Sequence, residues 1–137
     1  MKPRYLLDTN MCIYLLKRQP AGVAARFARC FVGEVVMSAV TLAELEYGVS
    51  CSGDNEDQNR SALDRLLEDI PALPFDAGAA RAYGPIRRAS REKSRDALDK
   101  LIAAHAVALD LTLVTNNTAD FAGYQGLRLE NWVEASA

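Results

Sequence analysis

Short apolar runs alternate with longer segments of helical periodicity along most of this sequence. The apolar runs predict strands at residues 4–7, 34–37, 71–75, 111–115 and 127–129. The segments between them predict helices at residues 11–17, 20–30, 38–49, 60–70, 78–91 and 97–109, with a short helical turn at 120–121. Because the strand runs are apolar on both faces, each strand must be covered on both sides. We therefore predict an α/β fold with a short, mainly parallel central sheet flanked by helices on both faces.

Length and composition narrow the class of protein. A chain of 137 residues has room for one core, so we expect residues 1–137 to form a single domain. Its longest apolar stretch, residues 101–109, is too short to cross a bilayer, and the N-terminus lacks the apolar core of a signal peptide. Three scattered cysteines (Cys12, Cys30 and Cys51) disfavour a disulfide framework or a zinc site. We expect a soluble protein of the reducing cytoplasm.

Asp8 and Asn116 each follow directly after a predicted strand. In parallel α/β sheets, functional groups gather beyond the carboxyl ends of the strands, which makes this edge the expected site. Taken alone, Asp8 is better explained as the N-cap of the next helix. Glu44 lies three residues after Thr41, a spacing that fits a helix capping box as well as it fits a functional acid.

Asp99 lies in the most apolar of the predicted helices. Its neighbours three, four and seven residues on are Ile102, Ala103 and Ala106, so we expect its carboxylate to be buried on most sides. Burying a carboxylate costs several kcal/mol, and a position near a helix N-terminus offsets only about 0.3–1 kcal/mol of that. A bound cation is therefore the preferred explanation for Asp99.

Four acids together indicate one reaction class, although Asp120 alone is explained equally well as a turn residue. Asp8, Glu44, Asp99 and Asp120 would form an oxygen-only site suited to Mg²⁺ or Mn²⁺. Such ions support phosphodiester hydrolysis. Motifs for other mechanisms, the Gly-x-Ser-x-Gly elbow and the Walker-type loop, are missing. The single histidine, His105, is more typical of a packing or surface residue than of a catalyst.

A basic stretch runs from residue 81 to residue 95, although the whole chain has a net charge of −2. It holds six cations against the single acid Glu92, and its candidate RNA-binding members are Arg87, Arg88, Arg91 and Arg95. A charge run of this kind is usually a solvated helix face. The alternative is a surface that binds phosphates.

Five segments, in order and with suitable spacing, resemble the VapC toxins, which are PIN-domain ribonucleases of toxin–antitoxin pairs. They are LLDTN (6–10), TLAELEYGV (41–49), DKLIAAHA (99–106), LVTNN (113–117, with Asp120) and GLRLENW (126–132). The resemblance spans nearly the whole chain and implies a PIN-domain fold. It departs before Asp99, where relatives often carry a Pro-Ile-Gly-like turn and this chain has residues 94–96. We assign no role to Asp96.

The resemblance implies roles at individual positions. Asp8 and Asp99 would be direct metal ligands, and Glu44 would complete the metal site or orient the attacking water. Asp120 falls where many members carry a fourth acid, often glutamate. Thr9 and Asn116 would support the site by hydrogen bonding.

The resemblance also implies partners and a substrate. A VapB-type antitoxin would cover the acidic site, often with a basic side chain that competes with the metal. The toxin would form a homodimer, and a hetero-oligomer with the antitoxin. RNA hydrolysis would leave a 5′-phosphate and a 3′-hydroxyl. The ending around residues 115–117 and 126–132 looks like the group that cuts initiator tRNA in the anticodon loop, so tRNA is the expected substrate.

Two other functions compete with this interpretation. A PIN fold acting only as an antitoxin-bound co-repressor would be expected to have lost an acid or its metal affinity, whereas all four acids are present. A small-molecule phosphatase would need a second aspartate two residues after the nucleophilic one, and Asn10 stands there instead.

Overall fold

The computed structural model describes residues 2–90 and 97–133. Its strands are β1 (Tyr5–Leu7), β2 (Val35–Ser38), β3 (Ala72–Leu73), β4 (Thr112–Val114) and β5 (Arg128–Glu130). Its helices are α1 (Thr9–Lys17), α2 (Ala21–Ala28), α3 (Ala39–Ser50), η1 (Gly53–Asn55), α4 (Glu56–Asp69), α5 (Ala77–Ala89), α6 (Ala97–Leu109) and α7 (Thr118–Phe121). None of the helices in these ranges is long and apolar enough to span a membrane.

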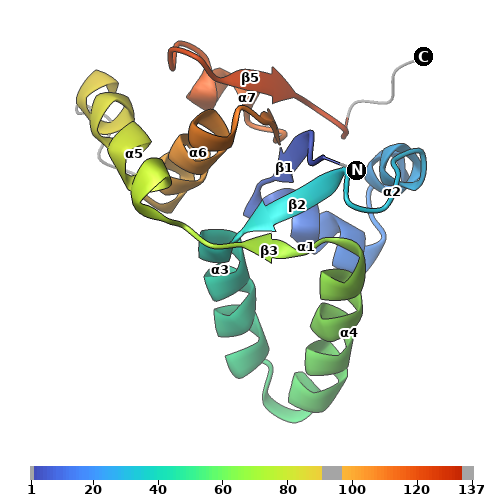
Figure 1. The fold of residues 1–137 in the computed structure, drawn as a ribbon. Helices are drawn as coiled ribbons and strands as arrows, with labels where there is room; N and C mark the ends of the chain where they lie inside the picture. Colours follow the sequence, from blue (N-terminus) through green and yellow to red (C-terminus); the bar gives the residue numbers. More distant parts are fainter. Residues whose placement is uncertain (1, 91–96, 134–137) are drawn as a thin grey trace.

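The five strands form one sheet in the order β3-β2-β1-β4-β5, and every neighbouring pair is parallel (Figure 1). Helices α1 to α4 cover one face, and α5 and α6 cover the other (Figure 1). The predicted α/β fold is therefore confirmed. The sheet is fully parallel because each strand is connected to the next through helices that cross a face of the sheet.

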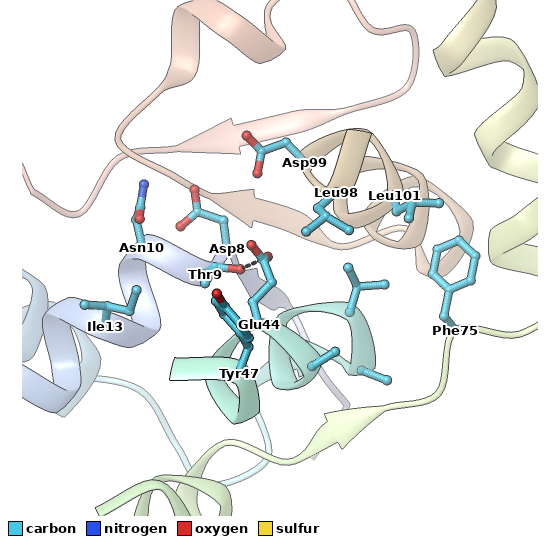
Figure 2. Close-up of a pocket in the computed structure, with 13 residues that line it drawn as sticks. Asp8, Thr9, Asn10, Ile13, Glu44, Tyr47, Phe75, Leu98, Asp99 and Leu101 are labelled. Atoms are coloured by element: carbon cyan, nitrogen blue, oxygen red, sulfur yellow. Dashed lines mark hydrogen bonds between the residues drawn. The ribbon is translucent and has the colours of Figure 1, made fainter. Parts of the chain in front are cut away.

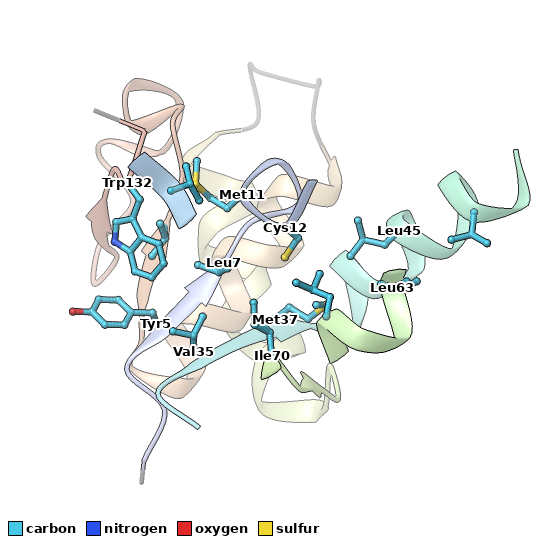
Figure 3. Close-up of a cluster of buried hydrophobic side chains, with 14 residues drawn as sticks. Tyr5, Leu7, Met11, Cys12, Val35, Met37, Leu45, Leu63, Ile70 and Trp132 are labelled. Atoms are coloured by element: carbon cyan, nitrogen blue, oxygen red, sulfur yellow. The ribbon is translucent and has the colours of Figure 1, made fainter. Parts of the chain in front are cut away.

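Alternating side chains of the central strands supply both halves of the core. Tyr5 and Leu7 point into the cluster beneath α1 to α4, where Val35 and Met37 of β2 join them (Figure 3). Leu6 points to the opposite face and packs against α5 and α6. Burial on both faces explains why these strands are continuously apolar rather than alternating with polar residues.

The helix predicted at residues 60–70 begins earlier in the structure. Within the polar segment that precedes it, residues 53–55 form the short helix η1, and α4 already begins at Glu56. Glu56 and Asp57 fall in the first turn of α4, where negative side chains interact favourably with the helix dipole. The polar composition therefore reflects an exposed helix N-terminus rather than a turn.

The strand order places a switch point between β1 and β4. The chain moves outward through β2 and β3 on one side, then returns to build β4 and β5 on the other. In open parallel sheets, the connections diverge at this point and leave a crevice beyond the carboxyl ends of the two central strands. Asp8 directly follows β1 there, and its backbone N–H donates to the carbonyl of Val114 at the end of β4 (3.0 Å).

Candidate active site

A pocket of about 940 Å³ opens at this switch point. It is lined by Asp8, Thr9 and Asn10 after β1, Ile13 of α1, Ala39, Val40, Ala43, Glu44 and Tyr47 of α3, Phe75, and Leu98, Asp99 and Leu101 of α6. Figure 2 shows the carboxylates of Asp8, Glu44 and Asp99 turned toward the same space. Three acids that lie far apart in the sequence, each from a different element, are thus brought to one pocket.

Asp8 is the most deeply placed of these acids, at 4 % exposure. It is also the N-cap of α1, because its Oδ1 accepts a hydrogen bond from the Met11 N–H (2.9 Å). Burial raises the pKa of Asp8, and the negative charge of Glu44 adds to the rise. Hydrogen bonds from Thr115 and the Met11 N–H lower the pKa by less. The capping interpretation is therefore confirmed, and Asp8 also lines the pocket.

Glu44 is not part of a capping box. The N-cap of α3 is Ser38, whose Oγ accepts from the Val40 N–H (3.0 Å), so Thr41 already lies inside the helix. Instead, the Thr9 hydroxyl donates to Glu44 Oε1 (2.5 Å) and lies 3.3 Å from the Thr41 hydroxyl. This contact joins the start of α1 to α3 and holds the Glu44 carboxylate in the pocket wall.

Asp99 lies in the first turn of α6 and is half-buried at the pocket. Its helical neighbours Ile102, Ala103 and Ala106 are fully buried, as the apolar sequence predicted. The carboxylate itself is less enclosed than expected, because the helix begins at the pocket and its first turn faces that opening. Asp8 is instead the most buried of the three pocket acids.

Asn116 and Thr115 complete the carboxyl end of β4, and Thr115 is not among the site residues predicted from the sequence. Asn116 Nδ2 donates to the Tyr14 hydroxyl (3.1 Å). Its Oδ1 is buried and accepts no hydrogen bond within the described part of the chain. Thr115, which is fully buried, accepts from the Asn117 N–H (3.0 Å), and its side chain lowers the pKa of Asp8. Its position as the last residue of the strand predicted at residues 111–115 was the available signal.

The remaining predicted residues lie outside the pocket lining. Asp120 is exposed in α7 and is not among the lining residues. Arg87 and Arg88 are exposed at the end of α5, and Arg87 donates to the Tyr83 hydroxyl (2.7 Å). The other two candidate RNA-binding residues, Arg91 and Arg95, lie outside the described residues, as does Asp96.

His105 lies behind the pocket wall rather than in it. Its Nδ1 is 2.8 Å from Ser38 Oγ, and its ring packs edge-on against Phe75. Burial lowers the pKa of His105, which favours the neutral ring at pH 7. The contact ties the middle of α6 to the N-cap of α3, and so links the helices that carry Asp99 and Glu44.

The available donors fit a hard divalent cation. Asp8, Glu44 and Asp99 present only oxygen, and a nearby cation would offset the cost of burying the Asp8 charge. Asn116 Oδ1, which accepts no hydrogen bond within the described residues, adds a neutral oxygen at the carboxyl end of β4. In residues 2–90 and 97–133, no three His, Cys, Asp or Glu side chains are grouped closely enough to hold a metal by themselves. Mg²⁺ is compatible with this arrangement, since it keeps several waters and uses one or two carboxylates.

Comparisons with known proteins show the family to which the chain belongs. Residues 5–126 match the model of the PIN domain family. A tRNA(fMet)-specific endonuclease VapC from Shigella flexneri is 39% identical over 131 residues, covering 94% of this chain and 98% of the relative. Ribonuclease VapC2 from Rickettsia felis is 38% identical, covering 93% and 97%. The crystal structure of DNA-bound VapBC from Salmonella typhimurium superposes with a TM-score of 0.86 at 32% identity, covering 95% of this chain and 98% of that chain.

Proposed function

Because this chain belongs to the PIN domain family and, within it, to the VapC ribonucleases, we propose that it is a divalent-metal-dependent endoribonuclease toxin whose substrate is tRNA. The observation that carries the proposal is the meeting of Asp8, Glu44 and Asp99 around one pocket. Each comes from a separate element, so the fold itself assembles the acidic site.

The chain's own groups suit hydrolysis by water. Asp8 and Asp99 would hold Mg²⁺ or Mn²⁺, which when bound would polarise the phosphoryl oxygen and lower the pKa of water. Thr9 occupies Glu44 Oε1, which leaves Oε2 to accept the proton of the attacking water. The water oxygen bonds to phosphorus as the bond from phosphorus to O3′ breaks. The O3′ leaving group takes up a proton, and the products are a 5′-phosphate and a 3′-hydroxyl.

The direct test is cleavage of tRNA by the purified protein with Mg²⁺ or Mn²⁺, and with EDTA. We expect cleavage only with metal, and a loss on the order of 10²–10⁴-fold in Asp99→Asn, because several kcal/mol of charge stabilisation would go with the ligand. Asp64→Asn is the matched control, since Asp64 is exposed on α4 away from the pocket. Undiminished cleavage by a folded Asp99→Asn protein, or by wild type in EDTA, would contradict the proposal.

The contact between Thr9 and Glu44 gives a second prediction. Thr9→Val keeps the shape of the side chain but removes the hydroxyl that holds Glu44 Oε1. We expect cleavage to fall about 10²-fold, the size of effect produced by displacing a catalytic group by about 1 Å. Thr9→Ser restores the donor and should cleave close to the wild-type rate. Equal rates in the valine and serine variants would show that Glu44 needs no positioning by this residue.

We further propose that a VapB-type antitoxin inhibits the site. The Rickettsia felis and Salmonella typhimurium structural relatives are VapBC complexes bound to DNA. The acidic pocket would attract a basic antitoxin side chain, which would compete with the metal ion. A toxin homodimer, a hetero-oligomer with the antitoxin and action in the cytoplasm belong to the same proposal.

The exact RNA target is also part of the proposal. The Shigella flexneri relative is named for tRNA(fMet), which makes initiator tRNA the first substrate to test. Sequencing RNA 5′ ends after induction would locate the cuts, and cuts spread over messenger RNA with intact tRNA would overturn this choice. Arg87 and Arg88, together with Arg91 and Arg95, remain candidates for binding neighbouring phosphates.

A further inference from the structure

Tyr47 is a large aromatic side chain left in solvent at the edge of the acidic pocket. It is 73% exposed and lies one helical turn after Glu44 on α3 (Figure 2). Within the described residues, five large hydrophobic side chains are exposed: Phe31, Val32, Tyr47, Leu98 and Leu109. Two of them, Tyr47 and Leu98 (46% exposed), line this one pocket.

The negative charge of the pocket limits how strongly it binds an RNA backbone, so affinity for RNA there depends on apolar surface. Three carboxylates repel the phosphates of an RNA strand, so the backbone by itself gains little affinity at this point. Bases are the other source of affinity, because every base has a face that stacks on an aromatic ring without regard to sequence. Most of the remaining lining is also apolar, from Ile13 beside Tyr47 to Phe75 and Leu101 beyond the acids (Figure 2).

We propose that Tyr47 binds a nucleobase of single-stranded RNA by stacking, at or next to the nucleotide whose bond is cut. This inference rests on the proposed ribonuclease function and adds a base-binding subsite to it. Residues three apart on a helix have Cβ atoms roughly 5–6 Å apart, so a base on Tyr47 lies within one nucleotide of a phosphate at Glu44. The subsite requires an unpaired base, which fits a loop rather than a duplex.

The geometry of Tyr47 suits a stacking residue. Cys51, the C-cap residue of α3, raises the pKa of Tyr47, so the ring stays uncharged at neutral pH. A tyrosine side chain has only two rotatable side-chain angles to fix, so it loses little conformational freedom when a base binds its face. The competing occupant of this exposed ring is a second copy of the chain, which the test below separates from RNA.

The experiment measures binding of a fluorescent single-stranded RNA oligonucleotide to proteins that carry Asp99→Asn to prevent cleavage. Adding Tyr47→Ala should weaken binding roughly 5- to 150-fold, the range for loss of one stacked base, while Tyr47→Phe should bind nearly as well as Tyr47. Phe31→Ala is the matched control, since Phe31 is 67% exposed but outside the pocket lining, and it should change nothing.

Abasic oligonucleotides identify the partner of Tyr47. Removing the stacked base should weaken binding to the Tyr47 protein but add nothing further in Tyr47→Ala, because both changes delete the same contact. Fully additive losses at every position, or unchanged RNA affinity with a shift from dimer to monomer in light scattering, would overturn the inference. Failure of the wild-type protein to cleave RNA at all would instead overturn the proposed function.

Discussion

Asp8→Asn should abolish RNA cleavage and also make the metal-free protein more stable at neutral pH. Cleavage should fall on the order of 10²–10⁴-fold, because the variant loses a charged metal ligand whose contribution is several kcal/mol. Stability should rise because Asp8 is 4 % exposed and burial disfavours its charged form. Asparagine carries no charge, and its side-chain oxygen can still accept the Met11 N–H that caps α1.

The pH dependence of this gain follows from the direction of the pKa shift. The pKa of Asp8 in the folded protein lies above the ordinary value of 3.8 for an aspartate side chain. The stability that the Asp8 carboxyl contributes is therefore fully present below pH 3.8 and is lost as the pH rises through the folded-state pKa. The stability difference between Asp8→Asn and wild type should be small at low pH and reach its full size above the folded-state pKa.

Urea unfolding of both proteins between pH 4 and pH 8, with EDTA or with excess Mg²⁺, measures these effects together. Mg²⁺ should stabilise wild type but not Asp8→Asn, since a ligand that binds only the folded state adds about 2.7 kcal/mol at 100 times its Kd. Asp8→Ala is the control for the cap, and should be less stable than Asp8→Asn by about 1 kcal/mol. An asparagine variant that is less stable than metal-free wild type at pH 8 would show that the buried charge is compensated within the protein.

The sequence predicted the sheet and the pocket acids because both depend on patterns within short segments. A run of residues that is apolar on both faces of the strand identifies a buried parallel strand, and Asp8 follows such a run directly. The partners of the acids were not predictable in the same way. The family resemblance gave Thr9 a supporting role, but that it contacts Glu44 depends on the fold, which brings distant segments together.

Rules based on the spacing of neighbouring residues failed where a contact with a distant residue replaced the contact expected within the helix. The spacing of Thr41 and Glu44 satisfies the capping-box pattern, but Ser38 caps α3 one residue before the helix and also contacts His105 of α6. Similarly, the exposure of Tyr47 could not be read from its apolar helix, because exposure depends on which face the neighbouring elements leave open.

The C-terminal segment shows how a sequence resemblance can reflect folding rather than chemistry. Residues 126–132 contributed to the expectation of an initiator-tRNA substrate, yet none of them lines the pocket. Trp132 is 3 % exposed, packs edge-on against Tyr5, and donates from Nε1 to Glu130 (2.8 Å). The Arg26 guanidinium lies over both rings and pairs with Glu130 (3.3 Å), which fastens α2 to the end of β5.

Trp132→Ala should therefore destabilise the protein strongly without changing where RNA is cut. Truncating a buried tryptophan costs about 3–5 kcal/mol, which for a chain of this size lowers the Tm by roughly 10–20 °C. Trp132→Phe keeps a ring against Tyr5 but loses the Nε1 donor, and should fall between alanine and wild type. Cleavage sites mapped well below both melting temperatures should coincide with those of wild type. Altered cut positions in a folded Trp132→Ala protein would show that this segment contributes to substrate choice as well as to the fold.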